Sequence, residues 1–173
     1  VFTYNLCVRT GAMDVIGSMI TSISSDRRLL ALLVAWCFGG FMEGMAGFGT
    51  AVAIPAGMLA GLGFEAVPAV LICLLANGVP TPYGSIGIPT VSVADLVGLD
   101  SLHLATVQLV QLAPFFVAMP LLIVLVAGRV ADDQGNVASV AERLHGVAGV
   151  ALLSGVSFVG AALVVAMFVG PEL

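Results

Sequence analysis

Apolar residues fill most of positions 29–64, but a polar and glycine-rich interruption divides them. The interruption reads Phe41-Met42-Glu43-Gly44-Met45-Ala46-Gly47-Phe48-Gly49-Thr50. A carboxylate and three glycines in hydrocarbon would leave charge and backbone groups without partners, so this segment must face protein or water. Residues 29–62 are therefore predicted to form a broken helix pair, discontinuous or re-entrant, in place of one spanning helix.

A second interruption follows a short apolar run that begins at Ala66. It reads Asn77-Gly78-Val79-Pro80-Thr81-Pro82-Tyr83-Gly84-Ser85-Ile86-Gly87-Ile88-Pro89, and its three prolines and three glycines exclude a regular helix. Residues 66–89 are thus predicted to be a short helix plus a break. Both breaks contain an aromatic residue, a glycine and a hydroxyl residue, followed by Ile-Pro, at Phe48-Gly49-Thr50 and at Tyr83-Gly84-Ser85. We expect the breaks, at residues 43–50 and 77–89, to lie at membrane depth and close together.

The rest of the chain is divided more simply. The pattern predicts two uninterrupted transmembrane helices and three less apolar segments. The helices are residues 102–127 and 146–169, and the other segments are a membrane-surface segment at 1–25, a loop or surface helix at 91–100 and a soluble loop at 128–145.

Charged residues near the ends of the apolar runs suggest an orientation. Asp26 offers N-cap chemistry to the first apolar helix, and Arg27 and Arg28 beside it favour a cytoplasmic start. Arginines in the loop at 128–145 mark that loop as cytoplasmic on the same grounds. If the two regions share a side, an even number of crossings lies between them.

Composition indicates the class of protein. The chain is 60% hydrophobic and only 9% charged, with a mean hydropathy of +1.17. A soluble domain of 173 residues could not cover so much apolar surface. We therefore predict an all-α polytopic membrane protein, a transmembrane helix bundle with discontinuous or re-entrant helices, in contact with the lipid bilayer of the cell membrane.

Residues 1–173 are predicted to be a single transmembrane region and an internal fragment of a longer protein, because neither Val1 nor the end after Gly170 resembles a natural terminus. The net charge is −5, with five arginines and no lysine, which argues against a nucleic-acid partner. No spacing of histidines, cysteines or acidic residues indicates a metal or a cofactor, and no nucleophile and base are paired as in an enzyme. We expect no catalytic residues and no cofactor.

The breaks are the candidate binding site. A helix that restarts inside the membrane presents unpaired N–H groups and a positive dipole end to an anion. Thr50 and Ser85 stand at N-cap-like positions of such restarts, and the neighbouring glycines allow close approach of a ligand. Alternatively, the glycines only permit tight helix packing. The candidate residues for the anion are Gly47, Phe48, Gly49, Thr50, Gly84 and Ser85.

Glu43 is the one acidic residue inside a membrane-depth run, and it is the candidate for taking up and releasing a proton. The alternative is that Glu43 caps N–H groups of the glycine loop. Asn77 and Tyr83 could hydrogen-bond a small polar solute, or could instead satisfy backbone groups freed by the prolines. Gln108 is expected to join helices through hydrogen bonds.

Several of these segments also resemble a known family. Phe38-Gly39-Gly40-Phe41-Met42-Glu43-Gly44-Met45-Ala46-Gly47-Phe48-Gly49-Thr50 is similar to the signature region of the L-lactate permeases. The likeness extends over nearly the whole chain, and the positions that match include Glu43, Gly44, Gly47, Phe48, Gly49, Asn77, Gly84, Gly87 and Pro89. Ala51, Gly78-Val79, Ser85 and Val110 depart from the residues common in that family.

This resemblance implies a transporter that moves lactate, and glycolate or related 2-hydroxy monocarboxylates, inward together with protons. It also implies that the remaining part of a full-length permease is a partner of this region. Two other classes stay open from the residues: a membrane channel or structural subunit without bound substrate, and an intramembrane enzyme. Concentration of the polar residues at two breaks favours the transporter.

Overall fold

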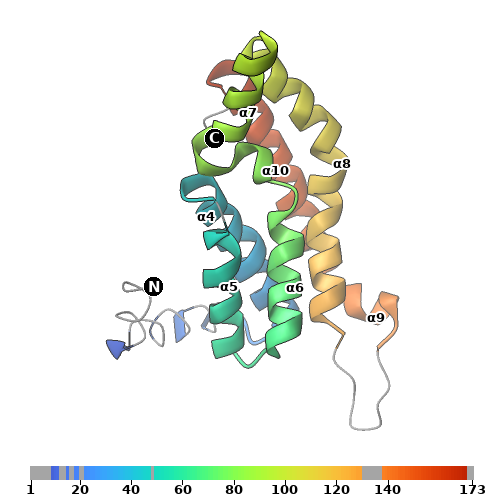
Figure 1. Cartoon of the computed structure of the whole chain (residues 1–173). Coiled ribbons are helices and arrows are strands. Elements are labelled where there is room, and N and C mark those ends of the chain that lie inside the picture. The colour runs from blue at the N-terminus through green and yellow to red at the C-terminus, as the bar shows by residue number, and fades with distance from the viewer. Residues whose placement is uncertain are drawn as a thin grey trace.

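The computed structural model describes residues 9–11, 15, 18–19, 22–47, 49–129 and 138–170, and its regular elements in these ranges are all helices (Figure 1). The predicted all-helical fold is therefore confirmed. The elements are α3 (Arg27–Ala31), the π-helical segment η1 (Leu32–Phe38), α4 (Gly39–Met45), α5 (Thr50–Gly61), α6 (Ala66–Asn77), the 3₁₀ turn η2 (Thr81–Tyr83), α7 (Gly84–Val97), α8 (Ser101–Ala127), α9 (Val140–Leu144) and α10 (Ala148–Phe168).

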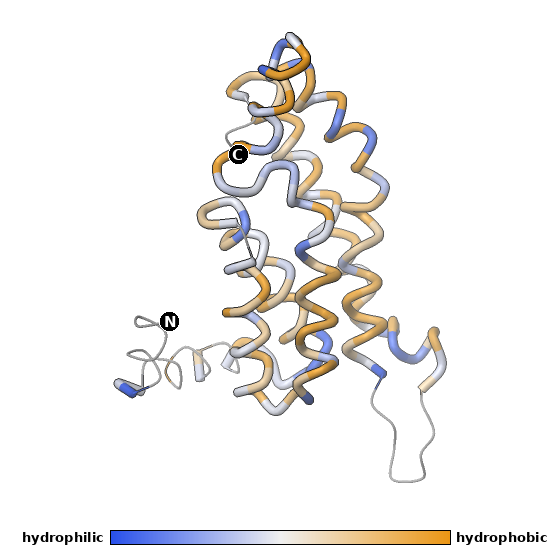
Figure 2. Tube along the Cα trace, viewed as in Figure 1, coloured by the Kyte–Doolittle hydropathy of each residue, from blue (hydrophilic) through white to orange (hydrophobic). Residues whose placement is uncertain are grey.

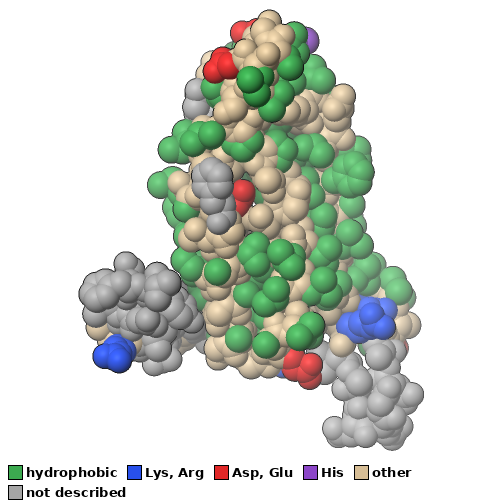
Figure 3. All heavy atoms as spheres, viewed as in Figure 1, with side chains coloured by type: hydrophobic (Ala, Val, Ile, Leu, Met, Phe, Trp, Pro, Cys, Tyr) green, Lys and Arg blue, Asp and Glu red, His purple; other side chains and the backbone are tan. Residues whose placement is uncertain are grey.

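The helices have the length and composition of membrane spans. Among the described residues, Arg27–Met45, Ser101–Ala127 and Ala148–Phe168 are each long and apolar enough to cross a bilayer. The pair Ala66–Asn77 and Thr81–Val97, bent by 66°, makes a fourth span when counted as one. Apolar residues run along these helices (Figure 2), and the visible charged side chains gather mainly at the two ends (Figure 3). The chain is a helical membrane protein.

The first broken helix pair forms a helical hairpin (Figure 1). The helix from Arg27 to Met45 is followed by a turn, and α5 then runs back toward the start (Figure 1). Arg27 Nη2 donates a hydrogen bond of 3.1 Å to the Gly63 carbonyl, and its guanidinium lies 4.4 Å from the centroid of the Phe64 ring. Both ends of the hairpin therefore lie at the same end of the molecule.

The first break is shorter than the residues 43–50 that the sequence suggested. Helix continues through Glu43 to Met45, and the Ala46 N–H still donates to the Met42 carbonyl at 2.9 Å. The reversal needs left-handed backbone only at Gly47, with φ of 52°, and at Gly49, with φ of 88°. Glycine adopts these angles without a Cβ penalty, whereas Gly44 is simply tolerated inside the helix.

The second break is also shorter than predicted. After η2, residues Ser85, Ile86 and Gly87 have φ of 50°, 60° and 72°, and regular helix then extends to Val97. Of the two alternatives for residues 91–100, a loop or a surface helix, residues 91–97 are helical and continue α7. Pro89 does not prevent this, since it lies in the first turn of the resumed helix, where its missing N–H is not needed.

An aromatic cluster joins the hairpin to the two long helices. The Trp36 ring in η1 lies 6.4 Å from Phe116 of α8 and 5.7 Å from Phe158 of α10, between ring centroids. The Phe116 and Phe158 rings stack at 4.9 Å. Such pairs contribute about 0.5–1.5 kcal/mol beyond the burial of their area. The cluster therefore packs the middle of the Arg27–Met45 helix against α8 and α10.

Gly155 determines how closely α8 and α10 approach. A Cβ at this position would lie 2.9 Å from the Phe116 carbonyl oxygen and 2.9 Å from the Val117 Cα, both backbone atoms of α8. We expect Gly155→Ala to destabilise the full-length protein by about 1–3 kcal/mol, because the two backbones must move apart. Thermal unfolding in detergent measures the loss. Gly160→Ala in the same helix is the control, because its Cβ would meet nothing within 4 Å; equal losses would contradict the packing argument.

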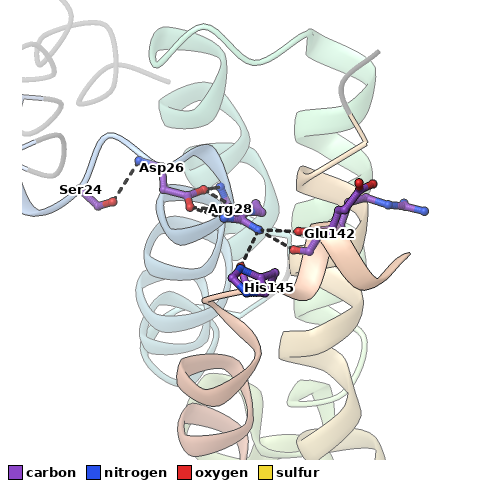
Figure 4. A network of polar contacts seen from close by, with 6 residues as sticks. Ser24, Asp26, Arg28, Glu142 and His145 are labelled. Atoms are coloured by element: carbon purple, nitrogen blue, oxygen red, sulfur yellow. Dashed lines mark hydrogen bonds and ion pairs between the residues drawn. The ribbon is translucent and has the colours of Figure 1, made fainter. Parts of the chain in front are cut away.

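Asp26, Arg28 and the segment from Glu142 to His145 form a polar clasp (Figure 4), at the end of the molecule away from the breaks (Figure 1). Arg28 Nη1 donates to the carbonyls of Glu142, Arg143 and His145 at 3.3, 2.8 and 3.1 Å, and Arg28 Nη2 pairs with Asp26 Oδ2 at 2.7 Å. The hydrogen bond from Arg28 lowers the pKa of the Asp26 carboxyl group. Asp26 also caps α3, as predicted, because its side chain accepts from the Arg28 N–H. The start of the hairpin and the segment before α10 thus lie at the same end of the molecule. In the sequence, the α6–α7 pair and α8 come between these two segments.

Candidate functional site

The two breaks are in direct contact, as the sequence predicted. The Ser85 hydroxyl donates a 3.0 Å hydrogen bond to the carbonyl of Ala46 in the first break. A Cβ on Gly47 would overlap the Ser85 Oγ and lie 3.2 Å from the Ser85 backbone nitrogen. The absence of a side chain at Gly47 therefore lets the tip of the hairpin rest on the left-handed turn of the second break.

Glu43 is buried against the second break. Its side chain is 3% exposed, and a Cβ on Gly84 would overlap Glu43 Oε1 and lie 3.0 Å from its Cδ. Glu43 Oε2 is buried and has no hydrogen-bond partner. A carboxyl group that carries an unsatisfied oxygen in such a place is costly unless a proton or another ligand occupies it.

The breaks lie within the length of the long helices. Tyr83, which precedes Gly84, donates its hydroxyl to the Ala105 carbonyl of α8 at 2.8 Å, and Ala105 is four residues inside α8. An apolar pocket of about 370 Å³ beside the second break is lined by Gly44 and Met45 of α4, by Tyr83 and by Val165 of α10, among others. The second break therefore packs against α8 and borders an apolar pocket, while its position at membrane depth stays a prediction.

Asn77 and Tyr83 differ in what they offer a solute. The Tyr83 hydroxyl has its proton committed to α8, so its evident role is to hold the break in position. The Asn77 backbone carbonyl accepts from the Thr81 hydroxyl at 2.8 Å, whereas the Asn77 Oδ1 is buried and unpartnered. Asn77 therefore retains an unused polar group at the end of α6.

Thr50 and Ser85 do not cap helices, which corrects the expectation drawn from their positions. Gly49 occupies the N-cap position of α5, and Thr50 is the first helical residue. The Thr50 N–H donates to the Gly47 carbonyl at 3.0 Å. The Ser85 hydroxyl bonds Ala46 across the two breaks instead of its own helix. The tight turns bring backbone groups near enough to satisfy each other, so no side-chain cap is needed.

Gly49 is the open end of the hairpin tip. Its backbone is left-handed, and a Cβ there would meet nothing within 4 Å. Phe48, the other predicted residue of this turn, lies outside the described residues. The N-terminal turn of α5, from Gly49 and Thr50 onward, therefore presents backbone to open space beside the contacting breaks.

Thr90 takes part in the arrangement but was not singled out from the sequence. It is buried, and its hydroxyl lies 2.7 Å from the Pro82 carbonyl and 2.9 Å from the Gln108 side-chain oxygen. Gln108, predicted to join helices, thereby links α7 to α8. A lone threonine in an apolar run carries no local signal for such a role, because its partners are 8 and 18 residues away.

Among the residues that the structure describes, no group of three or more histidine, cysteine or acidic side chains is placed to hold a metal ion. Cys37 and Cys73 are free thiols in apolar helices. The polar groups that the breaks bring together are hydroxyls, amides, backbone groups and one carboxyl, which suits binding and proton exchange more than covalent chemistry.

Comparisons with known proteins match the entire chain. The family model described as L-lactate permease covers residues 1–173. The L-lactate permease of Streptococcus iniae is 42% identical over all of this chain and 34% of its own length. The L-lactate permease of Bacillus subtilis strain 168 is 40% identical, and the glycolate permease GlcA of Escherichia coli K12 is 36% identical, each over all of this chain and 29% of its own length. The chain thus spans about a third of these relatives, and no solved structure matches it.

Proposed function

The chain belongs to the L-lactate permease family, and from that premise we propose that its full-length protein is a secondary transporter for lactate and for glycolate or related 2-hydroxy monocarboxylates, coupled to protons. It would cross the cell membrane several times and act without a cofactor or a catalytic residue. The observation that carries the proposal is the contact between two helix breaks around the buried carboxyl of Glu43.

The substrate carboxylate is assigned to backbone groups. Residues 29–102 contain no arginine, lysine or histidine, so neither break itself supplies a side-chain cation. The N-terminus of α5, a helix of 12 residues, supplies a positive dipole end at Gly49 and Thr50, where the Thr50 N–H itself is already bonded to the Gly47 carbonyl. Gly47, Phe48, Gly84 and Ser85 complete this proposed site. The Asn77 carboxamide, whose Oδ1 has no partner, is the proposed partner of the substrate hydroxyl, and Tyr83 is the second candidate.

Glu43 is proposed to couple the proton to the substrate. Its side chain packs on Gly84, one of the residues assigned to the substrate. A bound carboxylate would repel an ionised Glu43, so substrate and proton would favour each other's binding. The same contact means that loss of the proton would weaken the packing of the hairpin on the second break, which provides a physical link between protonation and movement.

A channel or a structural subunit is the competing assignment. A channel is expected to carry polar side chains along a whole helix face, whereas α10 carries, apart from glycine, only Ser154 and Ser157 among apolar residues. An intramembrane enzyme would require a nucleophile beside a base, and the described polar groups at the breaks contain no such pair. The transporter assignment rests on the contact between the two breaks and on the buried carboxyl of Glu43.

The direct test is uptake of labelled L-lactate by the full-length protein in proteoliposomes. We expect accumulation when the outside is acidic, and exchange of internal unlabelled lactate for external label without a gradient. A channel would pass lactate but would give no counterflow. If neither accumulation nor exchange exceeds that of empty liposomes, the proposed transport of lactate is wrong.

A glycine substitution tests the anion site separately from backbone strain. Gly49 and Gly63 have φ of 88° and 85°, and a Cβ at either would meet nothing within 4 Å. Alanine at either position should therefore lower the free energy of unfolding by about 1 kcal/mol. We expect Gly49→Ala to raise the KM for lactate at least several-fold and Gly63→Ala to leave it near the parent value, measured in exchange assays. Equal KM values for the two variants would contradict a substrate contact at Gly49.

A further inference from the structure

The second break contains a strained backbone turn. Ser85 and Ile86 have φ of 50° and 60°, and among the described residues they are the only ones other than glycine with a positive φ. A side chain in this left-handed region is crowded by its own backbone, and a β-branched residue such as isoleucine is a clear outlier there. Strain of this kind persists only where surrounding contacts fix the backbone. The turn therefore depends on contacts made by its neighbours.

Thr90 joins the two sides of this turn. Its hydroxyl donates to the carbonyl of Pro82, eight residues earlier, at 2.7 Å. Pro82 precedes the left-handed residues 85–87, and Thr90 follows them in the resumed helix. Thr90 is 1% exposed, and a hydrogen bond is stronger in such a buried place than in water. This one bond therefore closes the break on itself.

One face of α8 receives both sides of the turn. Before the turn, the Tyr83 hydroxyl donates to the Ala105 carbonyl at 2.8 Å. After the turn, the Thr90 hydroxyl lies 2.9 Å from the side-chain oxygen of Gln108. Ala105 and Gln108 are three positions apart in one helix, so they are neighbours on the same face. Thr90 thus contacts both the break and the helix on which the break rests.

The residues inside the turn make the contacts with the first break. Gly84 packs on the Glu43 carboxyl, and the Ser85 hydroxyl donates to the Ala46 carbonyl at 3.0 Å. Both Gly84 and Ser85 lie in the loop that the Thr90 hydrogen bond closes. A change in the separation of the two ends of this loop would therefore move the residues that meet the first break.

We propose that Thr90 is a positioning residue of the transport site, whose hydroxyl holds the second break in the strained turn that presents Gly84 and Ser85. This inference rests on the proposed function, because Gly84 and Ser85 are assigned there to the substrate. The Thr90 hydroxyl is itself engaged by Pro82 and Gln108, so Thr90 acts through the geometry of the turn and not by touching the substrate.

Removal of the hydroxyl tests this role. Thr90→Val keeps the β-branched shape and loses the hydrogen bonds, so we expect the KM for lactate exchange by the full-length protein to rise at least several-fold. Thr90→Ser keeps the hydroxyl and should retain a KM near that of the parent. Thr106→Val is the control, because it removes a hydroxyl that contacts the carbonyls of Leu102 in α8 and Ala166 in α10. An unchanged KM in Thr90→Val, or an equal rise in Thr106→Val, would overturn the proposal.

A second substitution separates the strained turn from a general loss of stability. Ile86→Gly relieves the strain, because glycine adopts left-handed backbone without a Cβ penalty. The turn then depends less on Thr90, and we expect Ile86→Gly to restore much of the affinity that Thr90→Val loses. Ile88→Gly is the matched control: Ile86 and Ile88 are 56% and 53% exposed, but Ile88 is helical, so glycine relieves nothing there. Equal recovery from both glycine substitutions, or none from Ile86→Gly, would contradict the role of strain.

Hydrogen exchange of the backbone reports on the turn without transport. In the full-length protein in nanodiscs, we expect N–H groups of residues 80–90 to exchange about tenfold faster in Thr90→Val than in the parent. Faster exchange in a protein that moves no lactate would retain the role of Thr90 in the turn and remove the proposed substrate. Unchanged exchange in a protein that transports lactate would leave the proposed function standing and overturn the positioning role.

Discussion

Glu43→Gln in the full-length protein is expected to abolish proton-driven accumulation of lactate while leaving lactate exchange measurable. Glutamine keeps the size and packing of the side chain against Gly84, but it cannot release a proton. The variant should behave like the permanently protonated protein, so exchange becomes less dependent on pH. Accumulation driven by a proton gradient and exchange at several pH values, both in proteoliposomes, measure the two parts of this expectation.

Glu65→Gln is the matched control for this charge change. Glu65 is an exposed residue at the N-cap of α6, at the far end of the helix from the breaks. Its substitution removes the same charge and should leave accumulation intact. If Glu43→Gln still accumulates lactate with the pH dependence of the parent, Glu43 has a structural role and the coupling group lies elsewhere in the full-length protein.

Gly84→Ala is expected to disrupt the contact between the two breaks and to reduce transport by at least an order of magnitude. Gly84 has φ of −61° and ψ of 156°, which any residue can adopt, so alanine would bring no backbone strain. Its Cβ would instead overlap the Glu43 carboxyl, which must then move. Overpacking of this kind costs about 1–3 kcal/mol. Initial rates of lactate exchange and the Tm of the full-length protein report the effect.

Gly40→Ala is the control, because Gly40 lies in the same helix as Glu43 and a Cβ there would meet nothing within 4 Å. This variant should retain transport and stability. A second variant, Glu43→Asp combined with Gly84→Ala, shortens the carboxyl group that the new Cβ would displace. It should recover part of the Tm that Gly84→Ala loses. No recovery, or equal loss at Gly40 and Gly84, would show that the Glu43–Gly84 contact is unimportant.

Local chemistry alone was enough to predict where helix could not continue. Proline removes a backbone donor, and hydrocarbon offers no replacement partner, so the residues around Gly47 and around Pro80 had to be irregular and enclosed. The same reasoning overestimated the length of both breaks. Helix persists through Glu43 and resumes after Gly87, because a turn of helix tolerates glycine inside it and proline at its start.

The roles of individual polar groups depended on contacts that no local pattern encodes. Tyr83 was a candidate to hydrogen-bond a solute, but its hydroxyl donates to the carbonyl of Ala105, 22 residues away. Ser85 was a candidate cap, but its hydroxyl meets Ala46, 39 residues away. A hydroxyl group binds whichever acceptor the packing brings within about 3 Å, and the sequence around it does not state which acceptor that will be.

The sequence by itself determined that this chain is a helical membrane protein with two interrupted segments and one buried carboxyl at the first of them, because hydrophobicity, glycine and proline act through solvation and through the backbone of the residue itself. Only the tertiary structure decided that the first segment turns back as a hairpin and that Glu43 rests on Gly84. The reversal depends on the left-handed backbone at Gly47 and Gly49, and the contact depends on the absence of a side chain 41 positions further along, at Gly84. Both are properties of how distant backbones meet, which is settled by packing.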